Sequence, residues 1–195
     1  MLVDYSFLGK GENMKIVAGT HKGRIIKSRK GNNTRPTLES VKESLFGIIA
    51  PYVSGYKFLD LYSGTGNIAL EALSRGASKA VMIEKDPEAL KVIIENVNDL
   101  GFTDVCRAYK NESIRAIEIL GKKREKFDII FMDPPYKDEV CSQTIKAIEK
   151  AGILEENGLI IAEHHLAEKM PEELGSYKKV DERVYSIKVM SFYTK

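Results

Sequence analysis

From Lys57 onward, short continuous apolar runs alternate with stretches that have the periodicity of amphipathic helices. The apolar runs predict strands at residues 57–63, 79–86, 105–109, 127–133 and 158–164. The helical stretches cover residues 67–77, 87–101, 113–120 and 139–151. Strands that are apolar throughout are typical of a parallel sheet covered by helices on both faces. The sequence therefore predicts a doubly wound α/β fold, closed by two weaker strands at residues 180–187 and 188–193.

The part of the chain before Lys57 adds a small N-terminal module to this domain. Residues 1–13 are interpreted as an extension, residues 14–36 as a basic hairpin and loop, and residues 37–195 as the α/β domain. Two short apolar runs around Ile16 and Ile25, with glycines between them, indicate the hairpin. A helix capped by Thr37 is expected to end at Pro51, because proline cannot continue a helix interior.

Composition narrows the class of protein. No apolar run approaches the roughly 18 residues of a membrane span, and the first residues lack the apolar core of a signal peptide. The two cysteines, Cys106 and Cys141, are far apart and lack the spacing of metal ligands. We therefore expect one cytoplasmic domain in a reducing environment, without a structural metal.

The net charge of +2 conceals a basic segment near the N-terminus. No acid falls between Met14 and Pro36, whereas the rest of the chain carries an excess of acids. The basic residues of this span are Lys15, Lys22, Arg24, Lys27, Arg29, Lys30 and Arg35. Ordinary surfaces mix both signs of charge, so a polyanionic partner and a solvated face both account for the segment.

A glycine turn lies between the first expected strand and its helix, in the stretch "DLYSGTGNIALEAL". Gly64 and Gly66 let the backbone turn tightly and approach a ligand, and the next helix offers free N–H groups. The turn lacks the third glycine of a dinucleotide fingerprint and the Gly-Lys-Ser/Thr of a P-loop. A ligand-binding turn and a tight packing turn both remain open.

The second and third strands end in polar residues at the same expected edge of the sheet. Glu84 stands twenty residues after the first glycine, where an acid accepts hydrogen bonds from both hydroxyls of a ribose. Asp86, directly before a proline, is the better candidate for a helix cap, which leaves Glu84 free. Asn111 and Glu112 follow the third strand. Together with the glycine turn, these residues predict a ligand that contains a nucleoside.

The fourth strand runs into "DPPY", where Pro134 and Pro135 fix the backbone. A nucleobase amine is a poor nucleophile because its lone pair is conjugated into the ring. Asp133 and the Pro134 carbonyl, both accepting hydrogen bonds from such an amine, would orient the lone pair and stabilise the developing positive charge. Tyr136 offers a flat face on which an extruded base can stack. A rigid turn without chemistry is the alternative.

The order "DLYSGTGN", "IEKD", "DPPY" resembles class I S-adenosylmethionine-dependent methyltransferases that act on an exocyclic amine. The blocks "MKIVAGTHKGRIIKS", "TRPTLESVKESLF" and "SFY" are similar to the RsmD family of bacterial 16S ribosomal RNA guanine-N2 methyltransferases. The resemblance covers Met14 to Tyr193. It implies a Rossmann-like, seven-stranded, mostly parallel sheet with an antiparallel last strand, and a monomer that meets 16S rRNA in the small subunit or its assembly intermediate.

The resemblance also implies roles for individual residues. Those expected to bind S-adenosylmethionine are Asp60, Tyr62, Ser63, Gly64, Gly66, Asn67, Glu84, Lys85, Asn111 and Glu112. The catalytic motif would be Asp133, Pro134, Pro135 and Tyr136. The segment expected to meet RNA holds His21, Lys22, Arg24, Lys27, Arg29 and Arg35.

Three other functions compete with the rRNA enzyme. A DNA adenine-N6 methyltransferase can use the same DPPY chemistry, but the short chain shows no target-recognition domain. A protein glutamine methyltransferase would leave the basic segment without a purpose. A non-catalytic RNA-binding assembly factor would need neither Asp133 nor the glycine turn.

Overall fold

The computed structural model describes residues 14–28, 37–135 and 139–195, with residues 37–39 described by their backbone alone. The helices in this part are α1 (Thr37–Val53), α2 (Asn67–Ser74), α3 (Pro87–Asp99), α4 (Ser113–Lys122) and α5 (Val140–Ala151). The strands are β1 (Lys57–Leu61), β2 (Lys79–Glu84), β3 (Cys106–Lys110), β4 (Phe127–Met132), β5 (Leu154–His165), β6 (Glu173–Leu174), β7 (Tyr177–Tyr185) and β8 (Lys188–Thr194). Each predicted strand and helix after residue 57 is present. None of the described helices is long and apolar enough to span a membrane.

The strands form one sheet in the order β3-β2-β1-β4-β5-β8-β7-β6. Strands β1 to β5 are parallel, and β8 runs antiparallel to both of its neighbours, β5 and β7. The expected number of seven strands was wrong, because the two residues of β6 pair with β7 as an eighth. Two residues are too short to leave a periodic pattern in the sequence. The strand order reverses between β1 and β4, where open α/β sheets bind ligands at the carboxyl ends of their strands.

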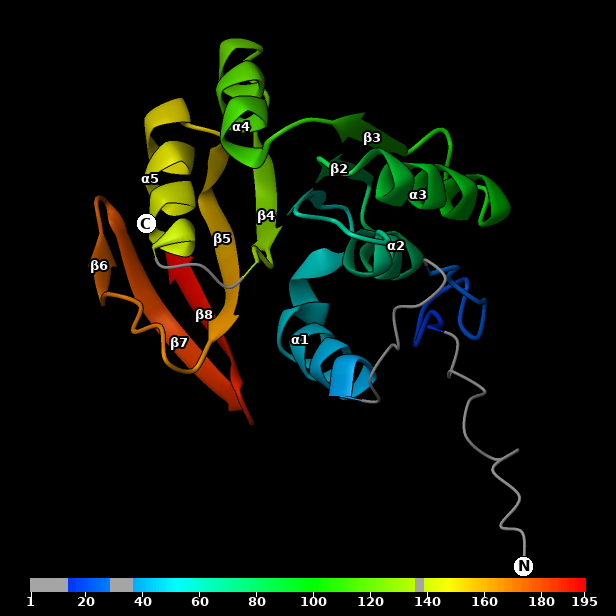
Figure 1. Ribbon diagram of the computed structural model, residues 1–195, viewed down its shortest axis with the longest axis horizontal. Coiled ribbons are helices and arrows are strands. Elements are labelled where there is room, and N and C mark those ends of the chain that lie inside the picture. Colours follow the sequence, from blue (N-terminus) through cyan, green and yellow to red (C-terminus); the bar gives the residue numbers. More distant parts are fainter. Residues whose placement is uncertain (1–13, 29–36, 136–138) are drawn as a thin grey trace, which may run out of the picture.

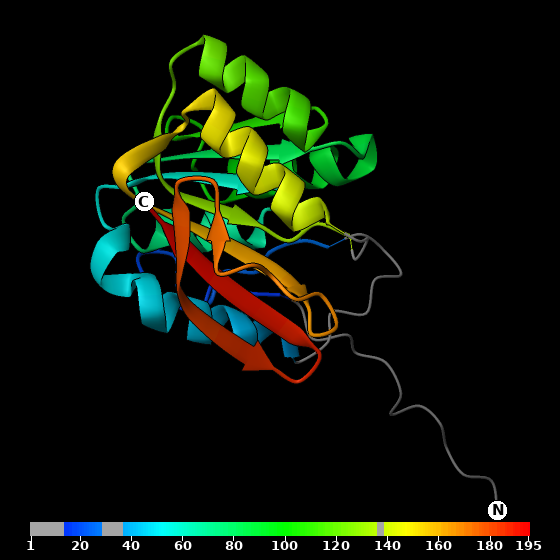
Figure 2. The same ribbon diagram turned by 90° about the vertical axis from the view of Figure 1, so that its left-hand side faces the viewer.

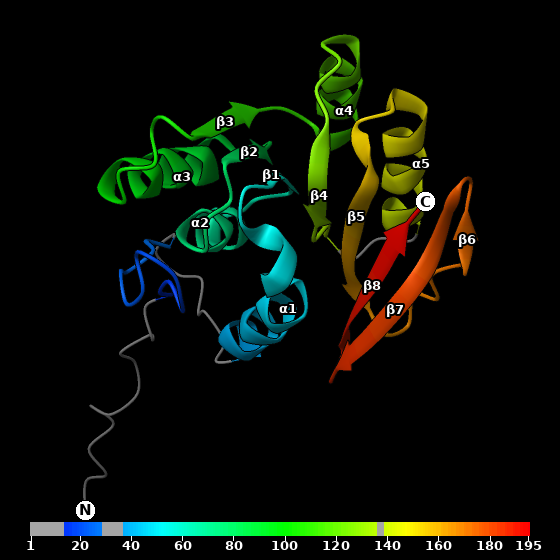
Figure 3. The ribbon, with the colours of Figure 1, turned by 180° about the vertical axis from the view of Figure 1, so that it is seen from behind.

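Helices cover the sheet on both faces (Figure 1). Figure 2 shows α4 and α5 on one side of the sheet and α1 on the other. In the view from behind, α2 and α3 lie beside β1 and β2, with residues 14–28 next to them (Figure 3). This is the layered arrangement that the apolar strands predict.

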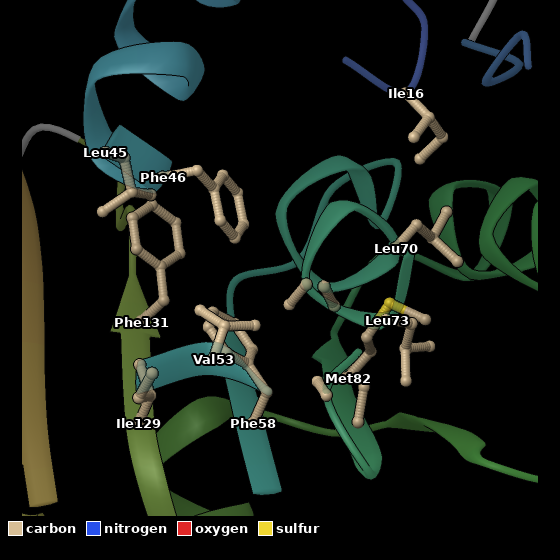
Figure 4. Packing of buried hydrophobic residues seen from close by; sticks show 14 of the residues in the cluster. Ile16, Leu45, Phe46, Val53, Phe58, Leu70, Leu73, Met82, Ile129 and Phe131 are labelled. Atoms are coloured by element: carbon tan, nitrogen blue, oxygen red, sulfur yellow. The ribbon is translucent and has the colours of Figure 1, made fainter. Parts of the chain in front are cut away.

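Successive side chains of a strand point to opposite faces of the sheet and belong to two separate hydrophobic cores. On β4, Ile129 and Phe131 belong to the core under α1, α2 and α3, whereas Ile130 and Met132 belong to the core under α4 and α5. Figure 4 shows Leu45 of α1 beside Phe131 in the first of these cores. The period-two alternation of strand side chains therefore tells which face each strand-end residue occupies.

Helix α1 does not end where the proline suggested. It continues through Pro51 to Val53, which is 1% exposed and packs into the first core. A proline this close to the end of a helix removes one intrahelical hydrogen bond, and the burial of Val53 offsets part of that loss. Whether Thr37 caps the helix concerns a side chain outside the described part.

Candidate active site

The glycine turn between β1 and α2 is fixed by hydrogen bonds around Ser63. The Ser63 hydroxyl donates to the backbone oxygen of Asp60 at 2.8 Å and accepts from the N–H of Ile83 at 3.1 Å. The N–H of Gly66 donates to the Ser63 oxygen at 2.7 Å. Ser63 therefore joins the turn to β1 and β2 and has a structural role in holding the turn.

The two glycines of the turn are required for different reasons. Both have left-handed φ values, 56° at Gly64 and 78° at Gly66. A Cβ atom on Gly64 would meet no atom of the described chain within 4 Å, so the turn is open on that side. A Cβ on Gly66 would lie 2.8 Å from the sulfur of Met82. Gly64 therefore leaves room for a ligand, whereas a side chain at Gly66 would clash with β2. A contact of Gly66 with the cofactor stays a prediction.

Glu84, at the carboxyl end of β2, holds the turn in place. One carboxylate oxygen accepts from the N–H of Gly64 and the other from the N–H of Asp86, each at 2.8 Å. Asp86 caps α3 by accepting from the N–H groups of Glu88 and Ala89, which confirms the predicted cap. The sequence predicted a free Glu84 side chain, whereas in the structure both of its oxygens accept backbone hydrogen bonds. Each of its oxygens still has acceptor capacity left for a ligand hydroxyl.

Asp60 lies on β1 and is 1% exposed. Neither carboxylate oxygen has a hydrogen-bond partner in the described part of the chain. Burial raises the pKa of Asp60 to about 8, with smaller contributions from the charges of Asp133 and Glu84, while the nearby Ala69 N–H opposes the rise. A buried carboxylate without a partner is costly, so a cationic group placed beside it stabilises the site.

These groups fit S-adenosylmethionine. The buried carboxylate of Asp60, whose oxygens have no partner in the described part of the chain, would suit the α-ammonium group of the methionine part. Glu84 has acceptor capacity for the ribose hydroxyls, and the open side of Gly64 leaves room for close approach to the backbone.

Other residues expected at the cofactor site are engaged elsewhere or exposed. The Tyr62 hydroxyl is 3.1 Å from that of Thr144, and the ring packs against the core under α4 and α5. The Asn67 side chain accepts a hydrogen bond from the Lys42 ammonium at 2.9 Å. Lys85 is exposed at the end of β2. A direct cofactor contact of these three residues stays a prediction.

Asn111 and Glu112 follow β3 at the same edge of the sheet. The N–H of Asn111 donates to the backbone oxygen of Glu84 at 3.1 Å, which holds this loop beside the ribose acid. The Asn111 side chain accepts from the N–H of Glu112 at 3.0 Å. Glu112 stands before α4 without capping it by its side chain. Either residue can therefore present a polar group where an adenine is expected.

Asp133 follows β4 at the carboxyl edge, next to β5. Met132 pairs with Ala162 across the two strands, which sets Asp133 beside Glu163 at the next position. Burial raises the pKa of Asp133 to about 7, with a further increase from Glu163 and an opposing effect of Lys188. Pro134 is buried and Pro135 exposed, whereas Tyr136 lies outside the described residues.

Four acids of the edge lie on one face of the sheet. Strand alternation places Glu84 with Met82, Asp60 with Phe58, Asp133 with Phe131, and Glu163 with Ile161, and all four apolar neighbours belong to the first core. The strands that carry them are adjacent in the order β2, β1, β4, β5. The expected cofactor acids and the DPPY acid are therefore brought into one row.

The basic segment is partly neutralised by α3. The Lys27 ammonium is 3.3 Å from Glu95 and 2.9 Å from Asp99, which raises the pKa of Lys27. The Arg24 guanidinium donates to the backbone oxygen of Asp99 at 2.7 Å. Lys22 is exposed in the turn and makes no ion pair with a described residue. Lys22 is therefore better placed than Lys27 to meet a phosphate.

Of the remaining RNA candidates, His21 is described and two arginines are not. The His21 ring contacts the Phe102 ring in a tilted arrangement, with centroids 4.4 Å apart and an angle of 54° between the planes, so it is held against the domain. Arg29 and Arg35 lie outside the described residues.

Asn96 joins the basic segment to the glycine turn. Its side-chain oxygen accepts from the N–H of Lys27 at 2.8 Å. Its amide nitrogen donates to the backbone oxygens of both Lys27 and Thr65, each at 3.1 Å. Within residues 14–28, the described part of the hairpin, Lys15 and Ile25 form an isolated antiparallel bridge. The segment is thus positioned mainly by the helices on which it rests.

Comparison with known proteins identifies the family. A family model described as Conserved hypothetical protein 95 matches residues 14–194. Ribosomal RNA small subunit methyltransferase D of Escherichia coli is 31% identical over 163 residues, which cover 84% of this chain and 80% of that protein. The chain belongs to this family, the RsmD family. The Bacillus subtilis protein YlbH is 35% identical over 182 residues, which cover 93% of this chain and 99% of that protein.

A solved structure of yhhF from Escherichia coli has the same fold as this RsmD-family chain. It superposes with a TM-score of 0.84 at 28% identity and covers 94% of this chain and 98% of that chain. The family resemblance and the class I methyltransferase fold expected from the sequence are therefore confirmed.

Two charged residues next to Asp133 were not among the candidates predicted from the sequence. Glu163 on β5 is 4% exposed, and its carboxylate pairs with the ammonium of Lys188 on β8. The only sequence signal for Glu163 is an acid at the carboxyl end of an apolar strand. Lys188 carries no local signal, because its place beside Glu163 depends on the antiparallel pairing of β5 with β8.

Proposed function

We propose that the protein transfers a methyl group from S-adenosylmethionine to the exocyclic N2 amine of a guanine in small-subunit ribosomal RNA. The observation that carries this proposal is the placement of Asp133 in one row with Asp60 and Glu84, on the same face of the sheet. A base amine at Asp133 would lie next to a cofactor held by the other two acids. The names of the relatives support rRNA as the substrate class.

The chain's own groups prepare the amine for attack. When bound, S-adenosylmethionine supplies an electrophilic methyl group on a sulfonium. Asp133 and the Pro134 carbonyl accept hydrogen bonds from the two N–H groups and orient the nitrogen lone pair. Transfer of the methyl group would leave the electron pair of the broken C–S bond on the cofactor sulfur, and Asp133 would accept the proton that the methylated nitrogen gives up. Tyr136 is proposed as the stacking platform for the base.

The electrostatic setting of Asp133 suits this role. An ionised carboxylate is an acceptor only, so both of its oxygens are available for the N–H groups of the amine and neither presents a competing O–H donor. Burial raises the pKa of Asp133 to about 7, so its ionised and protonated forms are both well populated at neutral pH. Asp133 can therefore accept the product proton more readily than an ordinary aspartate. Asp60 beside it favours the ammonium group of the cofactor.

The substrate is proposed to be 16S rRNA within a small subunit or its assembly intermediate, in the cytoplasm, with the enzyme as a monomer. Residues 14–36 would form the RNA-facing part of the chain, and residues 37–195 the methyltransferase domain. Lys22 is the described RNA candidate best placed for a phosphate, and Arg29 and Arg35 extend the same segment in sequence.

A labelled-methyl transfer assay tests the proposal. Wild-type protein is given labelled S-adenosylmethionine with 16S rRNA, isolated small subunits, DNA or protein, and the labelled RNA is digested to nucleosides. We expect label in rRNA or subunits, recovered as N2-methylguanosine. Label in DNA as N6-methyladenine would instead favour the DNA enzyme, and label in none of the substrates would favour the assembly factor.

A further inference from the structure

We propose that Glu163 and Lys188 read the Watson–Crick edge of the target guanine, with the Glu163 carboxylate accepting from N1–H and the Lys188 ammonium donating to O6. This inference rests on the proposed guanine-N2 methylation and names the residues that select the base. It assigns a recognition role to a buried ion pair that stability alone does not explain.

The pair lies beside Asp133 in the order that a guanine requires. Asp133 follows β4, Glu163 lies on β5 and Lys188 on β8, and these strands are neighbours in the sheet. All three side chains occupy the face of the first core, since Phe131, Ile161 and Met190 of the same strands belong to it. Neighbouring strands are about 4.8 Å apart, so the three groups form a short line along the edge.

The sequence of donors and acceptors along this line matches guanine. Its edge presents an amine donor at N2, a donor at N1 and an acceptor at O6. Facing them, in order, are the carboxylate of Asp133, the carboxylate of Glu163 and the ammonium of Lys188. Enzymes that act on an extruded base read its Watson–Crick edge by hydrogen bonds of this kind.

The same line opposes adenine. An adenine whose N6 amine faced Asp133 would direct its N1 lone pair at the Glu163 carboxylate, with two acceptors in contact. This arrangement is unfavourable, because the Glu163 carboxylate and the adenine N1 repel each other and neither acceptor receives a hydrogen bond. The pair thus accounts for the choice of guanine N2 over adenine N6.

The burial of the Glu163–Lys188 pair supports a role other than stability. Glu163 and Lys188 have side-chain exposures of 6% and 18%. Replacing a buried ion pair by apolar residues is often neutral or stabilising, so such a pair is weak evidence for a stabilising role. Its position next to the proposed reacting amine suggests recognition instead.

The wild-type protein is tested first, on synthetic RNAs that differ at one base. The methylated nucleotide is mapped, and RNAs are made with guanine, 2,6-diaminopurine or 7-deazaguanine there. Diaminopurine keeps the N2 amine but has an acceptor at N1 and an amine at position 6, whereas 7-deazaguanine keeps the whole edge. We expect kcat/KM to fall at least about a hundredfold for diaminopurine and to change little for 7-deazaguanine. Equal rates for guanine and diaminopurine would overturn the assignment.

Two variants then identify the residues. Glu163→Gln offers an N–H to the N1 acceptor of diaminopurine, so we expect the preference for guanine to shrink at least about tenfold. Lys188→Met should lower kcat/KM for guanine much more than for diaminopurine. Lys179→Met is the matched control, a lysine with 12% side-chain exposure that pairs with Glu182 on β7, and its base preference should stay unchanged.

The outcomes separate this inference from the proposed function. S-adenosylhomocysteine affinity checks that each variant keeps its cofactor site. If both variants slow guanine and diaminopurine equally, the pair has only a structural role and the inference fails, while N2-methylguanosine in the wild-type product leaves the proposed function standing. If wild type forms no N2-methylguanosine, the proposed function fails and the assignment fails with it.

Discussion

The ammonium of Lys42 lies 3.3 Å from the carboxylate of Glu71, and the two side chains are 1% and 0% exposed. The Lys42 ammonium also donates to the backbone oxygen of Lys15 at 2.6 Å. The Glu71 carboxylate accepts from the N–H groups of Val17 and Ala18 at 2.8 and 3.0 Å. This buried pair therefore joins α1, α2 and the basic segment in one network.

Breaking this pair should destabilise the protein. Lys42→Met removes the ammonium from Glu71, which keeps the Arg75 guanidinium at 2.7 Å and the N–H groups of Val17 and Ala18. Because these partners remain, we expect the free energy of unfolding to fall by about 1–3 kcal/mol. Chemical denaturation followed by circular dichroism measures the loss. Lys91→Met is the control, because Lys91 pairs with Glu88 in full exposure and its loss should leave stability nearly unchanged. Similar losses in both variants would contradict the importance of burial.

Asp60 should link stability and cofactor binding to pH in opposite ways. Its pKa is raised from 3.8 to about 8, so the folded protein holds this proton more tightly than the unfolded chain. The contribution of Asp60 to stability is greatest below about pH 4 and falls as the pH rises to about 8. We expect Asp60→Asn to stabilise the free protein by about 1–3 kcal/mol at about pH 8.

Cofactor binding should show the reverse dependence. Asp60 must be ionised to pair with the ammonium of S-adenosylhomocysteine, so wild-type affinity should rise as the pH increases from about 6 to about 8. Asp60→Asn should weaken binding and remove this rise, as measured by calorimetry at several pH values. An unchanged affinity and an unchanged pH profile would remove Asp60 from the cofactor site.

Asp133→Ala should abolish turnover while S-adenosylhomocysteine affinity stays nearly intact, because the carboxylate is proposed to act on the amine in the transition state. In the wild type, kcat/KM should rise with pH and level off above about 7, where Asp133 loses its proton. Methyl transfer to rRNA across a pH series provides both measurements. Asp104→Ala, an exposed acid after α3, serves as the control. Near-normal turnover in Asp133→Ala would refute the proposed chemistry.

Glu84→Ala should weaken S-adenosylhomocysteine binding by about 1.5–3 kcal/mol, the range for a hydrogen bond to a charged group. The variant also removes the acceptor for the N–H of Gly64, so amide hydrogen exchange at the glycine turn should speed up. Calorimetry and exchange measured on one sample separate the two effects. Faster exchange with unchanged affinity would leave Glu84 as a support of the turn alone.

The basic segment should respond unequally to charge reversal. If Lys22 contacts a phosphate, Lys22→Glu should lower rRNA affinity and reduce the salt slope by about one. Lys27→Glu should change the slope less, since Glu95 and Asp99 already neutralise Lys27. Filter binding of an rRNA fragment at several salt concentrations measures both, with exposed Lys178→Glu on β7 as the control. Slopes identical to wild type in all three variants would indicate a solvated face.

Much of the fold and two of the edge acids could be predicted from local patterns. Continuous apolar runs fix the strands, and parallel strands bring their carboxyl ends to one edge, so Glu84 and Asp133 could be assigned to one site. The predicted end of α1 at Pro51 was wrong, because Val53 is buried beyond it. A side chain at Gly66 would clash with the sulfur of Met82, a contact that no local pattern reveals.

Only the tertiary structure decided which charges meet. Lys27 is paired with acids of α3, Lys42 is buried against Glu71, and Glu163 meets Lys188 across two antiparallel strands. These partners are far apart in sequence, and local periodicity carries no information about them. The sequence by itself determined where strands end and which residue types stand there. The register between strands and the packing of helices determined which charged side chains are buried and which charges lie beside them. Burial and neighbouring charges in turn set the pKa values of these side chains, and thus their chemistry.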